Sequence, residues 1–242
     1  MTDAPRSLSD APRSLSDDRD AVEEQTRRLL ETVRLLPPDS IGDPSLCPGW
    51  TRGHVLSHIA RNADGVVNLA TAVTTGQHLP MYASPEARDA DIEAGSGRPL
   101  AEQLADLEAG AQRWREAAAT LGDEHADVRV KSRGGATVRG GYLPFMRLRE
   151  LVFHHVDLGA GFSFADVDDD DVLKAFLDDE VKRLTRNTET PSMTIRTDEG
   201  DAWSIVDGQP TVSGSRAAVL GWLARGLTDG VTGDLPTLPF GG

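Results

Sequence analysis

The chain has a single cysteine, Cys47, and few aromatic residues, which make up 5% of its 242 positions. One cysteine excludes an internal disulfide framework and fits a reducing compartment, so we expect a cytoplasmic protein. No hydrophobic run approaches the roughly 20 residues that a membrane-spanning helix needs. The polar first residues, of mixed charge, do not have the pattern of a secretory signal. The sequence therefore predicts a protein without disulfides and without a membrane span.

Positive charge is also scarce. The chain has 25 lysines and arginines against 39 aspartates and glutamates, which gives a formal net charge of -14. Nucleic acid is an unsuitable partner because binding to phosphates requires a basic surface. The overall negative field also repels other anions. An anionic substrate therefore requires a local pocket of basic side chains.

The first residues contain a near-perfect tandem copy, DAPRSLSDAPRSLS, without any hydrophobic period. We interpret residues 1–16 as a disordered leader. Regular structure is expected to begin at Ser16 or Asp17, because both residue types are good helix N-caps.

Helical periodicity recurs in four long segments. Hydrophobic spacing predicts helices over residues 17–36, 51–75, 100–121 and 144–158. We interpret the segment containing MYASPEAR as a loop and VKSRGGATVRGGY as a glycine-rich strand or loop. Four helices of this length indicate a bundle with its connections at the two ends.

The pattern changes after the fourth helix. An amphipathic segment, DDDDVLKAFLDDEVKRL, precedes three strand-like runs, MTIRT, AWSIV and PTVSG, and a helical segment, SRAAVLGWLARG. The tail beyond these segments is expected to be irregular. The predicted fold class is α+β, with a helical bundle over residues 17–163 and a smaller α+β domain over residues 164–242.

The fourth predicted helix carries a polar stripe on an otherwise apolar surface. Arg147, Glu150, His154 and Asp157 are spaced three, four and three residues apart, so they share one helix face. Buried charges are costly unless they pair or bind a cation. Glu150 and His154 lie one turn apart and could bind the same metal ion. The motif is weak by itself, because a Glu–His hydrogen bond in a protein core has the same spacing.

The second predicted helix places His54 and His58 among apolar residues. Metal ligands of a bundle are assembled on facing helices, which makes these histidines candidates to complete the site. Spacing alone does not choose between them. His54 lies near the helix start, where a histidine could cap the helix or face solvent, and His58 lies one turn deeper. His155 points about 100° away from His154 and is expected in the core or at an interface.

Several segments resemble the mycothiol-dependent maleylpyruvate isomerase family, and they occur in the family's order. They are GWTRGHVLSHIARNADGVVNL, PMYASPEAR, MRLRELVFHHVDLG and, near the end, VSGS, WLARG and DGV. The resemblance covers nearly the whole chain after residue 20. It implies a DinB-like metal-binding four-helix bundle followed by a small C-terminal α+β domain. It also places the family's metal triad on His58, Glu150 and His154, and thus favours His58 over His54.

The resemblance implies roles for three further residues. The arginine of the SPEAR segment is Arg88, the aspartate after the metal histidine is Asp157, and the C-terminal-domain arginine is Arg225. The arginines would bind the carboxylates of a dicarboxylate substrate, and Asp157 would orient a ligand or an arginine. From the residues alone, Arg88 could instead be a capping or surface residue. Arg225 could be a helix-end residue favoured by the dipole, and Asp157 a helix-end surface residue.

The implied reaction is the isomerisation of maleylpyruvate, or a close analogue, to fumarylpyruvate. Zinc with three protein ligands has an open position, where a small-molecule thiol, by resemblance mycothiol, would be deprotonated. The thiolate would add to the double bond, the resulting single bond would rotate, and elimination would release the product. Cys47, in a proline-flanked loop, is a weaker candidate for the nucleophile.

Three other functions remain open from the sequence. A mycothiol S-transferase would conjugate an electrophile and consume the thiol. A non-catalytic metal- or thiol-binding protein would bind without turnover. A zinc hydrolase is less well supported, because E-x-x-x-H is not the H-E-x-x-H motif and no glutamate is placed as a general base. The presence of both Arg88 and Arg225 favours a dicarboxylate substrate, and hence the isomerase.

Overall fold

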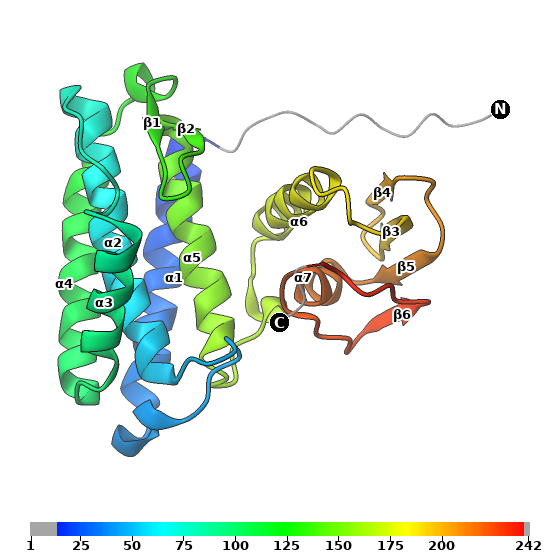
Figure 1. The fold of residues 1–242 in the computed structure, drawn as a ribbon, viewed down its shortest axis with the longest axis horizontal. Coiled ribbons are helices and arrows are strands. Elements are labelled where there is room, and N and C mark those ends of the chain that lie inside the picture. The colour runs from blue at the N-terminus through cyan, green and yellow to red at the C-terminus, as the bar shows by residue number, and fades with distance from the viewer. Residues whose placement is uncertain (1–13, 240–242) are drawn as a thin grey trace. The chain divides into compact units, whose positions relative to one another are not determined.

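The computed structural model describes residues 14–239, which form seven α-helices and two small sheets (Figure 1). The chain divides into two compact units, with the boundary between Phe162 and Ser163. The α+β fold class predicted from the sequence is confirmed. Among the described residues, no helix combines the length and the hydropathy that crossing a bilayer requires.

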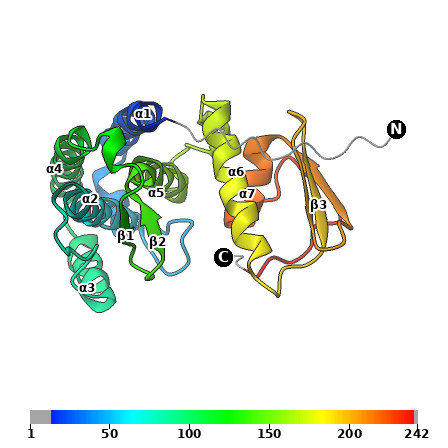
Figure 2. The same ribbon diagram turned by 90° about the horizontal axis from the view of Figure 1, so that it is seen from above.

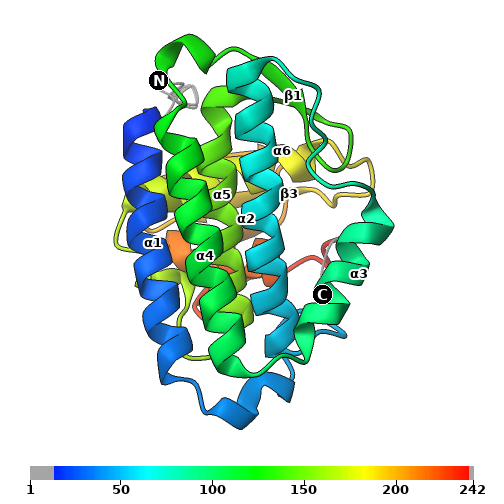
Figure 3. The same ribbon diagram turned by 90° about the vertical axis from the view of Figure 1, so that its left-hand side faces the viewer.

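Four long helices form the bundle of the first unit (Figure 3). They are α1 (Leu15–Leu35), α2 (Arg52–Thr75), α4 (Leu100–Ala119) and α5 (Leu143–Asp157). Both α1 and α2 pack against α4 and α5. All four helices were predicted from hydrophobic spacing, with ends close to those observed.

The central helix of the bundle is α2, which packs against α3, α4 and α5. Its residues Val55, Leu56 and Ile59 have no exposed surface. Burial of each such side chain contributes about 1.5–3 kcal/mol to folding. A polar side chain on this face therefore needs a partner within the protein, since water cannot reach it.

Helix α1 begins earlier than the sequence suggested. Ser14 is its N-cap, with the hydroxyl oxygen accepting a hydrogen bond from the Asp17 backbone N–H at 3.1 Å. The expected cap at Ser16 or Asp17 is therefore wrong, because Ser14 already satisfies a donor of the first turn. Of the leader expected over residues 1–16, residues 1–13 lie outside the described part of the chain.

Helix α3 (Pro85–Ser96) was not predicted, because its segment was interpreted as a loop. Ser84 caps the helix by accepting from the backbone N–H of Ala87 at 3.1 Å, and Pro85 occupies the first turn. Only Ile92 and Gly95 of this helix are buried. The segment consequently lacks the hydrophobic period by which the other helices were found.

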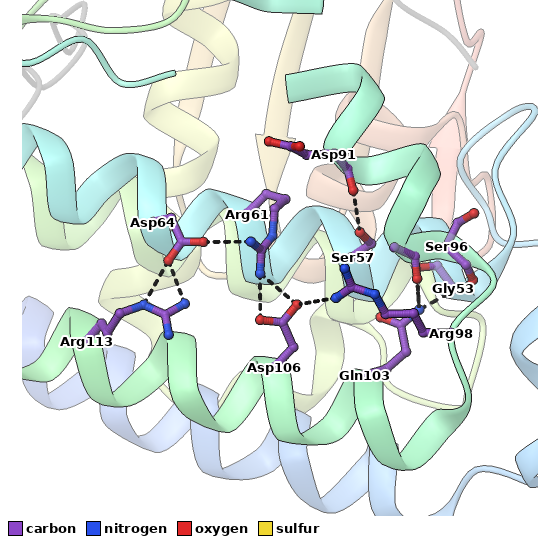
Figure 4. Close-up of polar contacts among 11 residues, drawn as sticks. Gly53, Ser57, Arg61, Asp64, Asp91, Ser96, Arg98, Gln103, Asp106 and Arg113 are labelled. Atoms are coloured by element: carbon purple, nitrogen blue, oxygen red, sulfur yellow. Dashed lines mark hydrogen bonds and ion pairs between the residues drawn. The ribbon is translucent and has the colours of Figure 1, made fainter. Parts of the chain in front are cut away.

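Small residues allow α3 to lie close to α2. A Cβ atom added to Gly95 would lie 2.2 Å from Ser57 Oγ, and one added to Gly53 would lie 2.0 Å from the carbonyl oxygen of Ser96. The buried Gln103 of α4 donates to the carbonyl oxygens of Gly95 at 2.8 Å and Gly53 at 3.3 Å (Figure 4). Gln103 and the two glycines thus fix one end of α3.

Ion pairs lie within α2, between α2 and α4, and between α4 and the residue Arg98 that precedes it (Figure 4). Arg61 pairs with Asp106 at 2.6 Å and with Asp64 at 3.1 Å, and Arg113 pairs with Asp64 at 2.6 Å. Arg98 also pairs with Asp106, at 3.2 Å. These side chains are partly exposed, so each pair contributes little stability on its own.

A short hairpin precedes α5. Strands β1 (Arg129–Lys131) and β2 (Thr137–Arg139) pair antiparallel, with Val130 opposite Val138. The turn between them is closed by the backbone N–H of Gly135, which donates to the carbonyl oxygen of Ser132 at 2.9 Å. Gly135 has a φ of 76°, which suits glycine. The sequence had left strand and loop open for this segment.

The second unit is a four-stranded sheet with two helices. Its elements are α6 (Asp170–Thr185), β3 (Met193–Thr197), β4 (Ala202–Ile205), β5 (Thr211–Gly214), α7 (Arg216–Arg225) and β6 (Val231–Gly233). The strand order is β4-β3-β5-β6; β3 and β5 are parallel and the other pairs antiparallel. Figure 2 shows α6 and α7 on one face of this sheet.

Strand β6 corrects the expectation of an irregular tail. It pairs with β5 through backbone hydrogen bonds, with Gly233 opposite Val212. A three-residue edge strand needs little side-chain hydrophobicity, since its backbone groups are satisfied by the neighbouring strand. The strand therefore left no alternating pattern in the sequence.

Candidate metal centre and active site

Three polar side chains converge where α2 faces α5. His58 Nε2 lies 2.9 Å from Glu150 Oε2, and His154 Nε2 lies 3.5 Å from the same oxygen. The three ligand atoms are all within 4.8 Å of one another. Tetrahedral zinc with bonds of about 2.0–2.1 Å holds its donor atoms about 3.4 Å apart. Both the donor types and their spacing therefore fit a divalent metal ion.

The charge state of this group follows from burial and from its neighbours. Burial, followed by the charge of His154, lowers the pKa of His58 to about 4, so this imidazole is neutral at physiological pH. Burial alone would raise the pKa of Glu150, but hydrogen bonds with His154 and His58 hold it well below its usual value. The site thus contains a neutral imidazole and an ionised carboxylate, the forms that bind metal.

Asp157 holds the second histidine of the group. Its Oδ2 atom, with no exposed surface, lies 2.8 Å from His154 Nδ1 and accepts a hydrogen bond from Cys47 Sγ at 3.2 Å. Burial alone would lower the pKa of His154, but hydrogen bonds with Asp157, Cys47 and Glu150 raise it well above its usual value. The contact fixes the ring with Nε2 toward Glu150. Complete burial excludes the alternative of a surface aspartate.

Arg88 reaches the group from the first turn of α3. Its side chain is 10% exposed, and its Nη2 atom donates to His58 Nδ1 at 3.1 Å. Nη1 donates to Asp89 at 2.6 Å, and the guanidinium carbon lies 6.0 Å from the centre of the Tyr82 ring. Arg88 is therefore neither a capping residue nor a free surface residue. It contacts one of the predicted metal ligands.

The loop before α2 and the first residue of α2 are attached to the end of α5. The backbone N–H of Leu46 donates to the carbonyl oxygen of Asp157 at 2.8 Å. The Arg52 side chain donates to the carbonyl oxygens of Leu158 at 2.9 Å and Gly159 at 3.1 Å. These donors satisfy carbonyl groups that have no partner within the helix. They also hold Cys47 against Asp157.

The same loop places Trp50 over the histidines. Its ring centre lies 5.5 Å from that of His58 and 6.5 Å from that of His154. His54 is engaged elsewhere: its Nδ1 atom accepts from the backbone N–H of Thr51 at 3.2 Å, as part of a capping box. Between the two histidines that the spacing left open, the structure therefore gives His54 the capping role.

Two other polar residues of α5, Arg147 and His155, are buried and make hydrogen bonds to neighbouring helices. Arg147 is buried and donates to the carbonyl oxygen of Ile59 at 3.0 Å and to Asn62 Oδ1 at 2.7 Å. Burial lowers its pKa to about 10, so the guanidinium stays charged at physiological pH. His155 has no exposed surface, and its Nδ1 atom lies 2.9 Å from the Gln25 side-chain nitrogen of α1. It is a core residue, one of the two alternatives considered.

The candidate metal ligands line a cavity of about 380 Å³. Its other walls include Met81, Tyr82, Met146 and the hairpin residues Ser132, Arg133 and Gly134. A cavity of this size, lined by apolar side chains and by convergent polar groups, is typical of a small-molecule site.

The first unit also matches a known domain. The family model described as the mycothiol maleylpyruvate isomerase N-terminal domain matches residues 22–159. The chain belongs to the mycothiol maleylpyruvate isomerase family. The resemblance found in the sequence motifs is thereby confirmed.

Two solved structures are similar to most of this chain. One is of a mycothiol-dependent maleylpyruvate isomerase, and the other is of a histidine-to-alanine mutant of the mycothiol-dependent maleylpyruvate isomerase. Each is 28% identical, covers 93% of this chain and 96% of its own, and has a TM-score of 0.87. Both are isomerases, which agrees with the enzyme class predicted from the sequence. No protein of curated function matches the chain.

The remaining residue predicted from the family resemblance lies in the second unit. Arg225 is the last residue of α7, and its Nη1 atom donates to the carbonyl oxygen of Ala224 at 2.8 Å. The left-handed Gly226 ends the helix directly after it. A role for Arg225 in substrate binding stays a prediction.

Several residues of the cavity were not predicted from the sequence. Trp50 and Tyr82 lie in loops, where no periodicity assigns a side chain to a face. Cys47 was considered only as a nucleophile, whereas the structure makes it a hydrogen-bond partner of Asp157. Arg133 lies in a glycine-rich turn, and nothing in its spacing relates it to α2 or α5.

Proposed function

We propose that this chain is a mycothiol-dependent cis–trans isomerase that converts maleylpyruvate, or a close analogue, to fumarylpyruvate. The observation that carries the proposal is the convergence of His58, Glu150 and His154 beside Arg88 in one cavity. The two solved relatives, both named as mycothiol-dependent maleylpyruvate isomerase, support the substrate and the thiol. A cytoplasmic location, expected from the single cysteine, is part of the proposal.

His58, Glu150 and His154 would hold one divalent ion. Two imidazole nitrogens and a carboxylate oxygen suit zinc, and three protein ligands are typical of catalytic rather than structural sites. Zinc would act as a Lewis acid that lowers the pKa of a thiol. The thiolate of mycothiol would be the nucleophile for reversible addition to the substrate double bond.

Asp157 would orient His154. The raised pKa of His154 means that its ring carries a proton on each nitrogen at physiological pH. Metal binding would require loss of the proton on Nε2, the atom that faces Glu150, and the Asp157 carboxylate at 2.8 Å would keep the other proton on Nδ1. The ring cannot turn without breaking this buried hydrogen bond. Asp157 is therefore a positioning residue.

Arg88 would bind a substrate carboxylate and stabilise the negative charge that develops on the substrate during addition. Its Nη2 atom donates to His58 Nδ1 while the His58 proton is on Nε2, facing Glu150. Metal coordination through Nε2 requires the proton on Nδ1 instead. With the metal held, Nδ1 would no longer accept from Arg88, and this N–H group would be available to the substrate.

The test is turnover by the purified, zinc-loaded protein with maleylpyruvate and mycothiol. Fumarylpyruvate and total free thiol are followed together. We expect many turnovers with no loss of thiol, and no reaction when thiol is omitted. Product that accumulates as a thiol adduct would identify an S-transferase, and metal binding without any turnover would identify a non-catalytic binding protein.

Two variants separate the chemical roles in this assay. His58→Ala removes one ligand and is expected to abolish turnover. Cys47→Ala keeps the three ligands and is expected to retain turnover within a few-fold, because Cys47 contacts Asp157 and does not act as the nucleophile. Complete loss in Cys47→Ala, with zinc still bound, would instead make Cys47 the attacking group.

A further inference from the structure

Arg133 is a second arginine in the cavity that holds the candidate metal ligands. It lies at the exposed tip of the β1–β2 hairpin, in the turn that joins the two strands. Within residues 14–239, its side chain makes no hydrogen bond or ion pair, whereas Arg88 donates to both Asp89 and His58. Arg133 therefore has all of its donors available to a ligand.

The hairpin gives the backbone of this arginine a defined position. The backbone N–H of Ser132 donates to the carbonyl oxygen of Ala136 at 2.9 Å, and that of Gly135 donates back to Ser132 at the same distance. A Cβ atom added to Gly134 would meet no atom within 4 Å. The turn is thus fixed by its own hydrogen bonds, and open space beside it can admit a ligand.

The negative charge of the chain means that an anionic ligand needs local positive charge, which an unpaired arginine in the cavity can supply. A net charge of -14 repels a dianion, and the cavity itself contains the Glu150 carboxylate. Arg88 supplies one guanidinium close to the metal ligands, and part of its charge is balanced by Asp89 at 2.6 Å. A dicarboxylate has two anionic ends. Arg225, which the family resemblance also relates to the substrate, belongs to the second unit, and among the described residues that line this cavity the arginines are Arg88 and Arg133.

We propose that Arg133 binds the substrate carboxylate that lies away from the metal ligands and so gives the site its specificity for dicarboxylates. This inference rests on the proposed isomerase function and adds to it a residue that selects the substrate. Arg133 lies at the exposed side of the cavity, where a guanidinium can hold the outer carboxylate by two parallel hydrogen bonds. Lysine in its place would keep the charge and lose this paired geometry.

The test compares Arg133→Gln and Arg133→Lys with a matched control, Arg139→Gln. Arg139 lies on β2 of the same hairpin, is 62% exposed and pairs only weakly with Asp127, at 3.4 Å. In the zinc-loaded full-length protein we expect Arg133→Gln to raise the KM for maleylpyruvate by about tenfold or more. The KM for mycothiol should be unchanged, and Arg133→Lys should restore part of the substrate affinity.

A second measurement does not depend on turnover. Calorimetry of the zinc-loaded protein compares the binding of succinate, a dicarboxylate, with that of butyrate, a monocarboxylate of the same chain length. We expect the wild-type protein to prefer succinate, and Arg133→Gln, but not Arg139→Gln, to lose that preference. The wild-type protein could lack isomerase activity while Arg133→Gln still loses the succinate preference. The proposed function would then fail, and the role of Arg133 in dicarboxylate binding would stand.

The inference is overturned by either of two results. One is an unchanged succinate preference in Arg133→Gln. The other is a rise in the KM for mycothiol in place of the KM for the dicarboxylate, which would assign Arg133 to the thiol.

Discussion

Asp157 is a buried carboxylate whose surroundings supply its hydrogen bonds. The His154 ring and the Cys47 thiol both contact its Oδ2 atom, and its backbone carbonyl oxygen accepts from Leu46. An unpaired charge in such a position would cost several kcal/mol. The hydrogen bonds therefore tie the loop before α2 to a histidine of the candidate metal centre.

Replacement of this carboxylate should weaken metal binding without removing a ligand. We expect Asp157→Asn to lower the affinity for zinc by about 10- to 100-fold, because the neutral amide holds the His154 ring less firmly and makes it less basic. Competition with a chromophoric chelator measures the affinity. Asp127→Asn, at a residue that is 92% exposed, serves as the control. Equal affinities in both variants would show that Asp157 does not support the ligand.

At the scale of elements, α3 is positioned by glycine contacts and hardly by hydrophobic burial. Its C-terminal half approaches α2 at Gly95 and Gly53, and its first turn carries Arg88 to His58. The position of this arginine therefore depends on the close contact at the other end of the same helix.

A methyl group at that contact should displace α3. In Gly95→Ala the added Cβ would lie 2.2 Å from Ser57 Oγ, and such overpacking costs about 1–3 kcal/mol. We expect a lower melting temperature and a higher KM for the substrate, both partly restored by Ser57→Ala in the same chain. Gly97→Ala is the matched control, because no atom lies within 4 Å of its added Cβ. Identical behaviour of the two alanine variants would contradict this account of α3.

In the second unit, an ion pair connects α7 to the turn before β4. Arg216 Nε donates to Asp201 Oδ2 at 2.6 Å, and both side chains are mostly buried. Burial alone would raise the pKa of Asp201, but hydrogen bonds with Arg216 and Thr197 bring it below its ordinary value of 3.8. A carboxyl group with a lowered pKa in the folded state stabilises the fold only while it is ionised.

This pair should make stability depend on pH in a defined direction. Above the ordinary aspartate pKa of 3.8 its contribution is fully present, and it is lost as the pH falls through the lower pKa of the folded state. We therefore expect Asp201→Asn to unfold at lower denaturant concentration than wild type at neutral pH. The difference should disappear in strong acid. Asp198→Asn, at an exposed acid of the same turn, is the control, and a difference that persisted in acid would rule out the charge as its cause.

At the scale of the whole molecule, the sequence reveals an element when that element buries a periodic apolar face. The four bundle helices and strands β3, β4 and β5 do so, and their segments were identified from spacing alone. Helix α3 and strand β6 are held by glycine contacts and backbone pairing, so their residues carry no such period. The same reason explains why α1 was expected to begin too late, since a cap is a single hydroxyl.

The candidate site was predictable to a similar extent. The spacing of Glu150, His154 and Asp157 on one helix implied that they share a face, and the family motif selected His58 as their partner. Contacts made by loop residues could not be predicted from residue spacing or from the family motif. Trp50 and Arg133 reach the cavity only because the chain folds back on itself, which no local pattern encodes.

Zinc-dependent turnover tests the proposed metal centre most directly. The full-length protein is stripped with a chelator and assayed with maleylpyruvate and mycothiol while zinc is added back. We predict no turnover before addition and a rise that ends at about one zinc per chain, as expected for a single three-ligand site. Glu150→Ala should neither bind zinc tightly nor regain activity. Full turnover by the metal-free protein, or a wild-type level in Glu150→Ala, would contradict the assignment of His58, Glu150 and His154 as the catalytic metal ligands.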